Sequence, residues 1–176
     1  MTSTLQTDRL ILRPYRDSDI PDLLPLIGAP EIASTTLRIP HPYTERDAKD
    51  FLASTRESSE VRFAITLRND GQLCGGVGLR LETQHRHAEL GYWIGVPFWR
   101  HGYATEASRA TLRYGFEQLQ LNRIFAHYFK GNDASGRVLK KIGMHHEGCL
   151  RQHVLKSGKF IDLELYAILR EQWESE

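Results

Sequence analysis

Hydrophobic positions recur along most of this 176-residue chain with a period of two or with a period near 3.6. Runs with a period of two predict β-strands, and runs with the longer period predict helices. The predicted strands are Leu5–Tyr15, Val61–Arg68, Gln72–Thr83, Ala88–Gly95, Arg123–Phe129, Cys149–Leu155 and Phe160–Leu169. The predicted helices are Ser18–Ile27, a segment capped by Thr44 that runs through Arg56, Ala104–Leu119 and Asp133–Ile142.

Turn and cap residues fix several of these boundaries. Thr44 and Asp47 have the spacing of a capping box at the start of a helix. Asn69-Asp70-Gly71 is a strong hairpin signal between two predicted strands. Prolines indicate a loop between the first two helices, at Pro30, Pro40 and Pro42.

The order of the elements predicts an α+β fold built on one mixed sheet of about seven strands. Three consecutive strands at its start suit antiparallel pairing. The helix between residues 88–95 and 123–129 suits a right-handed parallel crossover. No internal repeat or long linker interrupts the chain, so we expect a single domain over residues 1–176.

Composition narrows the function classes. The net charge is +1, with 23 basic and 22 acidic residues, which argues against a nucleic-acid coat. No apolar run reaches the roughly 18 to 20 residues that cross a bilayer. The N-terminus lacks a signal-peptide core, and Cys74 and Cys149 cannot form a disulfide framework. We therefore expect a cytoplasmic protein that binds neither nucleic acid nor membrane.

The most informative segment joins a strand to a helix. The tight loop Trp99–Ala104 opens directly into the predicted helix, whose first N–H groups are unpaired and carry a partial positive charge. Such a loop suits a phosphate, and Arg100 and His101 add donors. The segment from Pro97 to Arg151 contains nine Lys and Arg residues and four Asp and Glu residues, so it is locally basic. An ordinary loop before a solvated basic helix is the alternative. The segment matches neither a Walker loop nor a dinucleotide fingerprint.

The residues Trp99-Arg-His-Gly102-Tyr-Ala104 resemble the pyrophosphate loop of the GNAT acyl-CoA N-acyltransferases, Gln/Arg-x-x-Gly-x-Gly/Ala. Trp99 replaces the usual Gln or Arg, as is common in the RimJ/RimL-type branch of ribosomal-protein N-terminal acetyltransferases. Other segments resemble that branch over nearly the whole chain: Thr7–Arg13, Ala88–Ile94, Gly102–Ala107, Asn132–Ser135, Leu139–Met144 and Glu147–Arg151.

This resemblance implies a twisted GNAT-like sheet that splays in its middle, with helices on both faces, and acetyl-CoA as co-substrate without a metal. Backbone groups around Tyr92–Ile94 would pair with the pantetheine arm. Gly91 and Gly95 would mark a bulge or a close approach in that strand. The implied cofactor-binding residues are Tyr92, Trp93, Ile94, Arg100, His101, Gly102, Tyr103, Ala104, Thr105, Asn132 and Ser135.

The resemblance also suggests catalytic residues for direct attack by an amine within a ternary complex. Glu89 is the candidate base, with a pKa raised by a partly apolar cleft. A surface or ion-paired glutamate is its alternative. Ser135 is the candidate proton donor for the leaving thiolate, with Tyr128 and Tyr166 as further candidates. Asn132 suits a contact with pantetheine, but it also suits the N-cap of a helix.

The acceptor is left open by the sequence. A protein N-terminus fits the resemblance, whereas polyamines, amino sugars and amino acids are acceptors of other relatives. Leu37–Tyr43, which belongs to the acceptor-selecting region, is apolar and basic with no acidic cluster nearby, which leans against polyamines. A catalytically silent acyl-CoA-binding module and a ribosome-associated binding protein are the rival classes. A homodimer through the last hairpin is an analogy with relatives. A metal site at His145, His146, Cys149 and His153 has no ligand framework.

Overall fold

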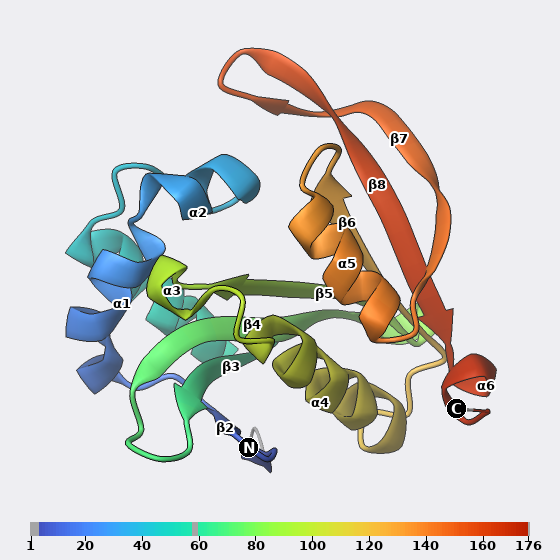
Figure 1. The fold of residues 1–176 in the computed structure, drawn as a ribbon, viewed down its shortest axis with the longest axis horizontal. Coiled ribbons are helices and arrows are strands. Elements are labelled where there is room, and N and C mark those ends of the chain that lie inside the picture. The colour runs from blue at the N-terminus through green and yellow to red at the C-terminus, as the bar shows by residue number, and fades with distance from the viewer. Residues whose placement is uncertain (1–3, 58–59, 176) are drawn as a thin grey trace.

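A computed structural model describes residues 4–57 and 60–175, with no side chains described for residues 55–57. Eight strands form a sheet in the order β1-β2-β3-β4-β5-β6-β8-β7 (Figure 1). The strands are β1 Leu5–Gln6, β2 Leu10–Arg13, β3 Glu60–Leu67, β4 Leu73–Glu82, β5 His87–Ile94, β6 Arg123–Phe129, β7 His145–Lys156 and β8 Lys159–Leu169. The α-helices are α1 Ile20–Ile27, α2 Pro30–Thr35, α3 Glu45–Glu57, α4 Tyr103–Glu117, α5 Asp133–Lys141 and α6 Arg170–Trp173.

Two predictions at the N-terminal end are wrong in detail. Leu5–Tyr15 forms two short antiparallel strands instead of one, because Thr7 turns the chain by bonding the backbone of Leu10 at 3.0 and 3.2 Å. The expected proline loop contains α2, which begins at Pro30. Proline suits the first position of a helix because the missing N–H has no intrahelical acceptor there. Residues 1–3 of the N-terminal segment, in which no signal-peptide core is expected, lie outside the described residues.

The remaining local signals are confirmed. The N–H of Thr44 donates to the carboxylate of Asp47 at 2.8 Å, and the N–H of Asp47 donates back to the Thr44 hydroxyl at 3.3 Å. Asn69–Gly71 turns β3 into β4, with Gly71 in the left-handed region at φ 77°. The β7–β8 turn places Ser157 and Gly158 at φ 50° and 76°, as a tight hairpin requires.

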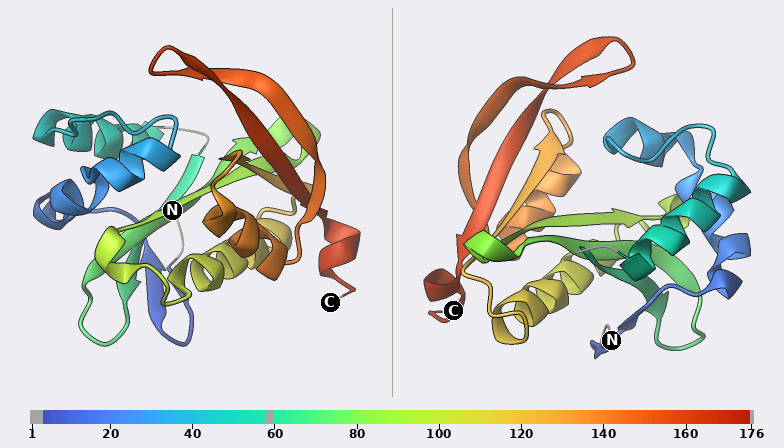
Figure 2. Two further views of the ribbon diagram at one scale, coloured as in Figure 1. Left: turned by 45° about the horizontal axis from the view of Figure 1, so that its top comes forward. Right: turned by 180° about the vertical axis from the view of Figure 1, so that it is seen from behind.

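Helices cover both faces of the sheet, as predicted (Figure 2). On one face, α4 and α5 bury residues such as Leu112, Phe116 and Leu139 against the sheet. On the other face, α1, α2 and α3 form a second cluster that includes Leu23, Ile32 and Leu52. None of the helices in the described parts of the chain is long and apolar enough to cross a membrane.

The decisive feature is the short pairing between β5 and β6. These two strands run parallel, as the crossover predicts, and pair only from His87 with Arg123 to Glu89 with Phe125. Beyond that point β5 stays paired with β4, while β6 stays paired with β8. The sheet therefore splays in its middle. The expected bulge is absent from the β4–β5 ladder, which runs from residue 87 to residue 94 without a register shift.

A buried ion pair ties the start of α1 to β2. Asp19 is 5% exposed and accepts two hydrogen bonds from the guanidinium of Arg13, at 2.7 and 2.9 Å. The N–H of Arg16 donates to the same carboxylate at 2.8 Å. Burial alone would raise the pKa of Asp19, but the bonds from Arg13 and Arg16 outweigh it and hold that pKa below its usual value. The pair therefore fixes the start of α1 against the sheet.

The Asp19→Asn variant is expected to lower the free energy of unfolding at pH 7 by roughly 3 kcal/mol, because it leaves the Arg13 charge buried and unpaired. Since the pKa of Asp19 is lowered on folding, its contribution exists above the ordinary pKa near 4 and is lost as the pH falls. Urea unfolding at several pH values measures both effects. The gap between wild type and variant should shrink below about pH 4. An equal loss from Asp22→Asn, an exposed change on the same helix, would contradict this account.

Candidate functional site

A cavity of about 640 Å³ lies where β5 and β6 separate. Its walls come from β4, β5, β6, α3, α5 and the segment after α2. Because the gap interrupts the sheet, side chains from both faces of β5 reach the cavity. It therefore offers one opening on the α4–α5 face and another on the α1–α3 face.

Strand alternation sorts the predicted residues between these two faces. Tyr92 follows Leu90 into the core cluster on the α4–α5 face, and Tyr128 of β6 lies on that same face. Trp93 packs instead into the cluster under α1 and α3, so Glu89 shares its face. Ser135 reaches the cavity from α5, next to Tyr92. The predicted catalytic residues thus line one cavity from opposite sides.

Glu89 is surrounded by positive partners. Its carboxylate accepts a hydrogen bond from Arg80 at 2.6 Å, lies 3.3 Å from Nδ1 of His127, and has Arg38 at 3.7 Å. Burial raises the pKa of Glu89, but His127 and Arg80 together lower it further, so the net pKa is below the ordinary value. The raised pKa expected from the sequence is therefore wrong, although apolar residues such as Val77, Leu90 and Trp93 do line the cleft. The ion-paired alternative describes this carboxylate.

On the α4–α5 side of the gap, Tyr92 connects β5 to α5. The Tyr92 hydroxyl donates to the backbone carbonyl of Ser135 at 3.4 Å, and burial raises the pKa of Tyr92 to about 12. Asn132 caps α5, because its side-chain oxygen accepts from the N–H of Ser135. Tyr128 lines the cavity as well, and burial raises its pKa to about 12. Its hydroxyl fits against Gly136, where a Cβ would lie 2.6 Å away.

The loop before α4 presents free backbone donors, as the sequence predicted. Gly102 has φ 81°, and Arg100 has φ 65°, both in the left-handed region. The N–H of Glu106 donates to the Gly102 carbonyl at 3.1 Å. Helix geometry then leaves the N–H groups of residues 103–105 without an intrahelical acceptor. The indole N–H of Trp99 donates to the Ile94 carbonyl at 2.6 Å, so Trp99 anchors the loop to the end of β5.

Arg9, the residue before β2, anchors this loop. Its guanidinium donates to the His101 carbonyl at 2.9 Å and to the carboxylate of Glu106 at 2.7 Å. The Thr7 hydroxyl donates to the same carboxylate at 2.6 Å, and Arg9 lies 5.0 Å from the centre of the Tyr103 ring. The Thr7–Arg13 motif was recognised in the sequence without a role. In the structure, its first residues fix the loop and the first turn of α4.

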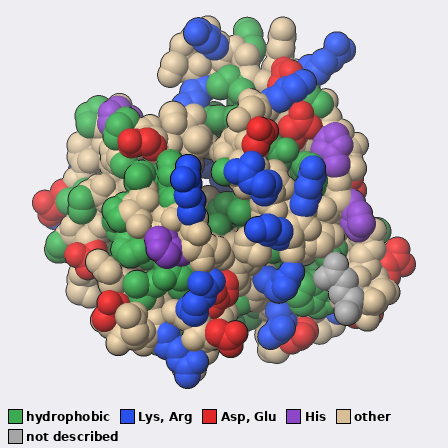
Figure 3. Space-filling model, viewed as in Figure 1, with side chains coloured by type: hydrophobic (Ala, Val, Ile, Leu, Met, Phe, Trp, Pro, Cys, Tyr) green, Lys and Arg blue, Asp and Glu red, His purple; other side chains and the backbone are tan. Residues whose placement is uncertain are grey.

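The predicted positive surface lies beside this loop. Figure 3 shows Lys and Arg side chains gathered over α4 and α5, next to a hollow in the middle of that face. Its exposed members include Arg109, Arg113, Arg137, Lys140 and Lys141. A highly charged anion would be attracted to this face, although the whole chain is nearly neutral.

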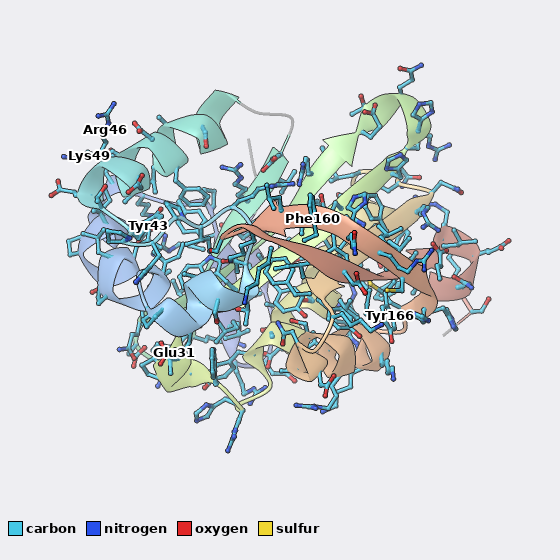
Figure 4. All side chains as sticks on the ribbon, turned by 90° about the horizontal axis from the view of Figure 1, so that it is seen from above. Glu31, Tyr43, Arg46, Lys49, Phe160 and Tyr166 are labelled. Carbon is cyan, nitrogen blue, oxygen red and sulfur yellow. The ribbon has the colours of Figure 1, made fainter. Side chains whose placement is uncertain are left out.

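The other opening is bounded by α2 and by the β7–β8 hairpin. Figure 4 shows the hairpin reaching across toward α2, with Phe160 near its tip. The ammonium group of Lys156 donates to the carbonyls of Ala33 and Thr36. Phe160 is 65% exposed beside this bridge. Leu163 of β8 lines the cavity, so the hairpin borders it on one side.

The acidic residues near that opening correct another expectation. Four carboxylates line the cavity: Asp47, Asp50, Glu60 and Glu89. The sequence suggested no acidic cluster near Leu37–Tyr43, yet Asp47 and Asp50 come from α3, which begins just after that segment, and Glu60 and Glu89 join them from β3 and β5. Arginines also line the cavity, namely Arg38, Arg62 and Arg80. Glu60 pairs with Arg62 at 2.5 Å, so much of the negative charge is neutralised.

The predicted residues fall into two neighbouring groups. Glu89, Tyr92, Trp93 and Ser135 line the cavity, whereas residues 100–105 form the loop at the start of α4. Ile94 is buried, and its carbonyl is already taken by Trp99. The N–H of Gly95 donates to the Cys74 carbonyl of β4 at 2.9 Å. Because backbone groups alternate in direction along a strand, those of Trp93 also point toward β4. Within the described residues, no three His, Cys, Asp or Glu side chains gather as metal ligands would.

Comparisons with known proteins agree with this geometry. The family described as acetyltransferase (GNAT) domain matches residues 9–145. The uncharacterized N-acetyltransferase YoaA of Bacillus subtilis (strain 168) is 34% identical over 175 residues, which cover 97% of this chain and 98% of that protein. The [ribosomal protein uS5]-alanine N-acetyltransferase of Escherichia coli (strain K12) is 33% identical over 84 residues, 48% of this chain and 43% of that protein. A GNAT-family acetyltransferase from Bacillus anthracis has a TM-score of 0.88 at 27% identity, covering 96% of this chain and 99% of that one.

Proposed function

The chain belongs to the GNAT acetyltransferase family, and on that premise we propose that it transfers the acetyl group of acetyl-CoA to a primary amine within a ternary complex. The observation that carries this proposal is the interrupted pairing of β5 and β6 beside the free amides that begin α4. A single extended thioester can use both features at once. The phosphates suit the amides, and the acyl end suits the cavity.

The loop residues fit the phosphate part of the co-substrate. The amides of residues 103–105 point out of the first helical turn and favour negative charge. The open space around Gly102 lets an anion approach closely, because only a nitrogen of Arg9, at 3.4 Å, would touch an added Cβ. Arg100 and His101 are exposed at the same loop and supply side-chain donors.

The open edge of β5 fits the pantetheine arm. Alternation turns the backbone groups of Leu90 and Tyr92 toward the side that β6 has left. An extended chain with amide groups can pair there as an added strand would. Ser135 lies on the same side of the cavity as the expected sulfur atom, which supports its role as proton donor to the thiolate. The side-chain oxygen of Asn132 already accepts the N–H of Ser135. A contact with the arm would use the side-chain nitrogen of Asn132 or replace that bond.

The acceptor amine enters from the α1–α3 side. We propose an amine at the N-terminus of a protein, with small amines as the alternative. The similarity to an enzyme that acetylates an alanine of a ribosomal protein supports the first, over about half of this chain. The four carboxylates of the cavity keep a cationic small amine as a real candidate. A catalytically silent module would bind acetyl-CoA without turnover.

Gly102→Val is expected to weaken acetyl-CoA binding at least tenfold in isothermal titration. A β-branched residue is strained at φ 81° and disturbs the loop amides. Gly71→Val is the matched control, since Gly71 has φ 77° in the exposed β3–β4 turn, where an added Cβ meets nothing within 4 Å. The control should lose stability but keep its affinity. Equal affinity of wild type and the Gly102 variant would remove the phosphate site from this loop.

Free-thiol release tests the acceptor class. Short peptides with a free α-amine, the same peptides with a blocked N-terminus, and spermidine are compared at equal concentration. The proposal predicts turnover of the free peptides, because an α-amine with a pKa near 8 is partly neutral at pH 7.5. Turnover of spermidine alone would assign the small-amine class. Tight acetyl-CoA binding with no turnover across a broad amine panel would favour the silent module.

Ser135→Ala is expected to lower kcat roughly tenfold or more, because the thiolate then leaves without a positioned donor. Its affinity for acetyl-CoA should stay within a factor of two in calorimetry, since the backbone carbonyl that holds Tyr92 remains. Tyr128→Phe is the comparison variant on the same cavity wall. If Ser135→Ala keeps full kcat and Tyr128→Phe loses it, the donor role belongs to Tyr128.

A further inference from the structure

We propose that His127 is the group that removes the proton from the acceptor amine, and that Glu89 acts as a positioning residue that orients the imidazole. The inference rests on the acetyl transfer proposed above and deepens it. Nothing in the sequence places His127 beside Glu89. The parallel register of β5 and β6 does so.

The two side chains meet at the point where the strands part. Glu89 pairs with Phe125 in the last step of the β5–β6 ladder. His127 stands two residues further along β6, so its side chain lies on the same face as that of Phe125. Nδ1 of His127 is 3.3 Å from Oε1 of Glu89, and both residues line the cavity. The imidazole therefore lines the cavity directly beside Glu89.

This contact selects the tautomer that a base requires. An ionised carboxylate only accepts hydrogen bonds, so Nδ1 of a neutral His127 carries the hydrogen. Nε2 then keeps a free lone pair, which can take a proton from an ammonium group. The same division of roles between carboxylate and imidazole serves many general bases.

The surroundings of Glu89 make it a poor base by itself. Arg80 donates to Oε2 at 2.6 Å, and Arg38 is 3.7 Å from the same oxygen. Arg80 also lies 3.6 Å from Glu60. Burial raises the pKa of Glu89, but the contact with His127 and the charge of Arg80 outweigh it and hold that pKa below the ordinary value. The second carboxylate oxygen, Oε1, lies 3.3 Å from Nδ1 of His127 and accepts its hydrogen.

Few charged groups face His127. Glu89 approaches from β5, with Arg80 and Arg38 behind it. From β7, the ring of His153 stacks at 6.5 Å between centroids. The β8 residue paired with His127 is Leu165, which is apolar, and Phe125 packs edge-on at 5.3 Å. The anion of Glu89 is therefore the direct ionic partner among these neighbours, and it favours the imidazolium that forms when the proton arrives.

The proton inventory closes without a further reagent. His127 Nε2 takes one proton from the acceptor ammonium, and the amine lone pair becomes available for the acetyl carbonyl carbon. A carbon–nitrogen bond forms and the carbon–sulfur bond breaks. The second nitrogen proton passes to solvent as the amide forms, and the thiolate takes a proton from solvent or from Ser135, which regains its own from solvent. The imidazolium then returns its proton to water.

The test compares pH profiles of kcat/KM for three variants, measured with the best acceptor from the panel above. His127→Gln is expected to lower kcat/KM roughly hundredfold and to abolish the acidic limb. Glu89→Gln is expected to lower it several-fold while keeping that limb, since the imidazole remains but loses the carboxylate that orients it. His146→Gln is the matched control, because His146 forms a 2.7 Å pair with Glu164 and does not line the cavity. It should leave the profile unchanged.

A second measurement does not depend on turnover. Nitrogen-15 NMR of the imidazoles is expected to show His127 with the hydrogen on Nδ1 in wild type, and a mixture of tautomers in Glu89→Gln. The assignment is overturned if His127→Gln keeps the acidic limb, if Glu89→Gln alone removes it, or if the hydrogen lies on Nε2. Calorimetry with acetyl-CoA separates the two levels of the argument. Loss of binding by wild type would overturn the proposed function itself, whereas binding and turnover with an unaltered His127→Gln profile would overturn only this assignment.

Discussion

The short parallel pairing of β5 and β6 is the constraint on which the site depends. Two strands that stayed paired would bury their backbone groups in the sheet and leave no passage between its faces. Here pairing stops after Glu89 and Phe125, while each strand keeps its other neighbour. The core stays intact, yet one edge of β5 is open. The cavity, the exposed amides of β5 and the meeting of Glu89 with His127 all follow from this separation.

Much of this arrangement could be predicted from local residues. The capping box at Thr44, the hairpin at Gly71 and the crossover around α4 are written in short segments, and each is confirmed. The loop proposed to bind the diphosphate is equally local, because Gly102 and the helix that follows it are contiguous. Its anchoring by Arg9 is not local, since 97 residues separate Arg9 from Glu106. The motif that supplies Arg9 was visible, but its partner was not.

What could not be predicted depends on register and on convergence in space. A one-residue change in the pairing of β5 with β6 would place His127 on the opposite face from Glu89. No residue near Glu89 in the sequence indicates that Arg38, Arg80 or His127 lies beside it. The sequence therefore suggested a raised pKa for Glu89 in a partly apolar cleft. The acidic lining was missed in part for the same reason, because Glu60 of β3 and Glu89 of β5 join Asp47 and Asp50 of α3 only in space.

A crystal structure with coenzyme A bound is the most direct measurement of the central claim, which is that one ligand spans the α4 amides and the gap between β5 and β6. The account predicts diphosphate oxygens within hydrogen-bond distance of the N–H groups of residues 102–105. It also predicts that the pantetheine arm runs along Leu90 and Tyr92, with its sulfur beside Ser135. A diphosphate bound away from that loop, or an arm outside the gap, would contradict the account.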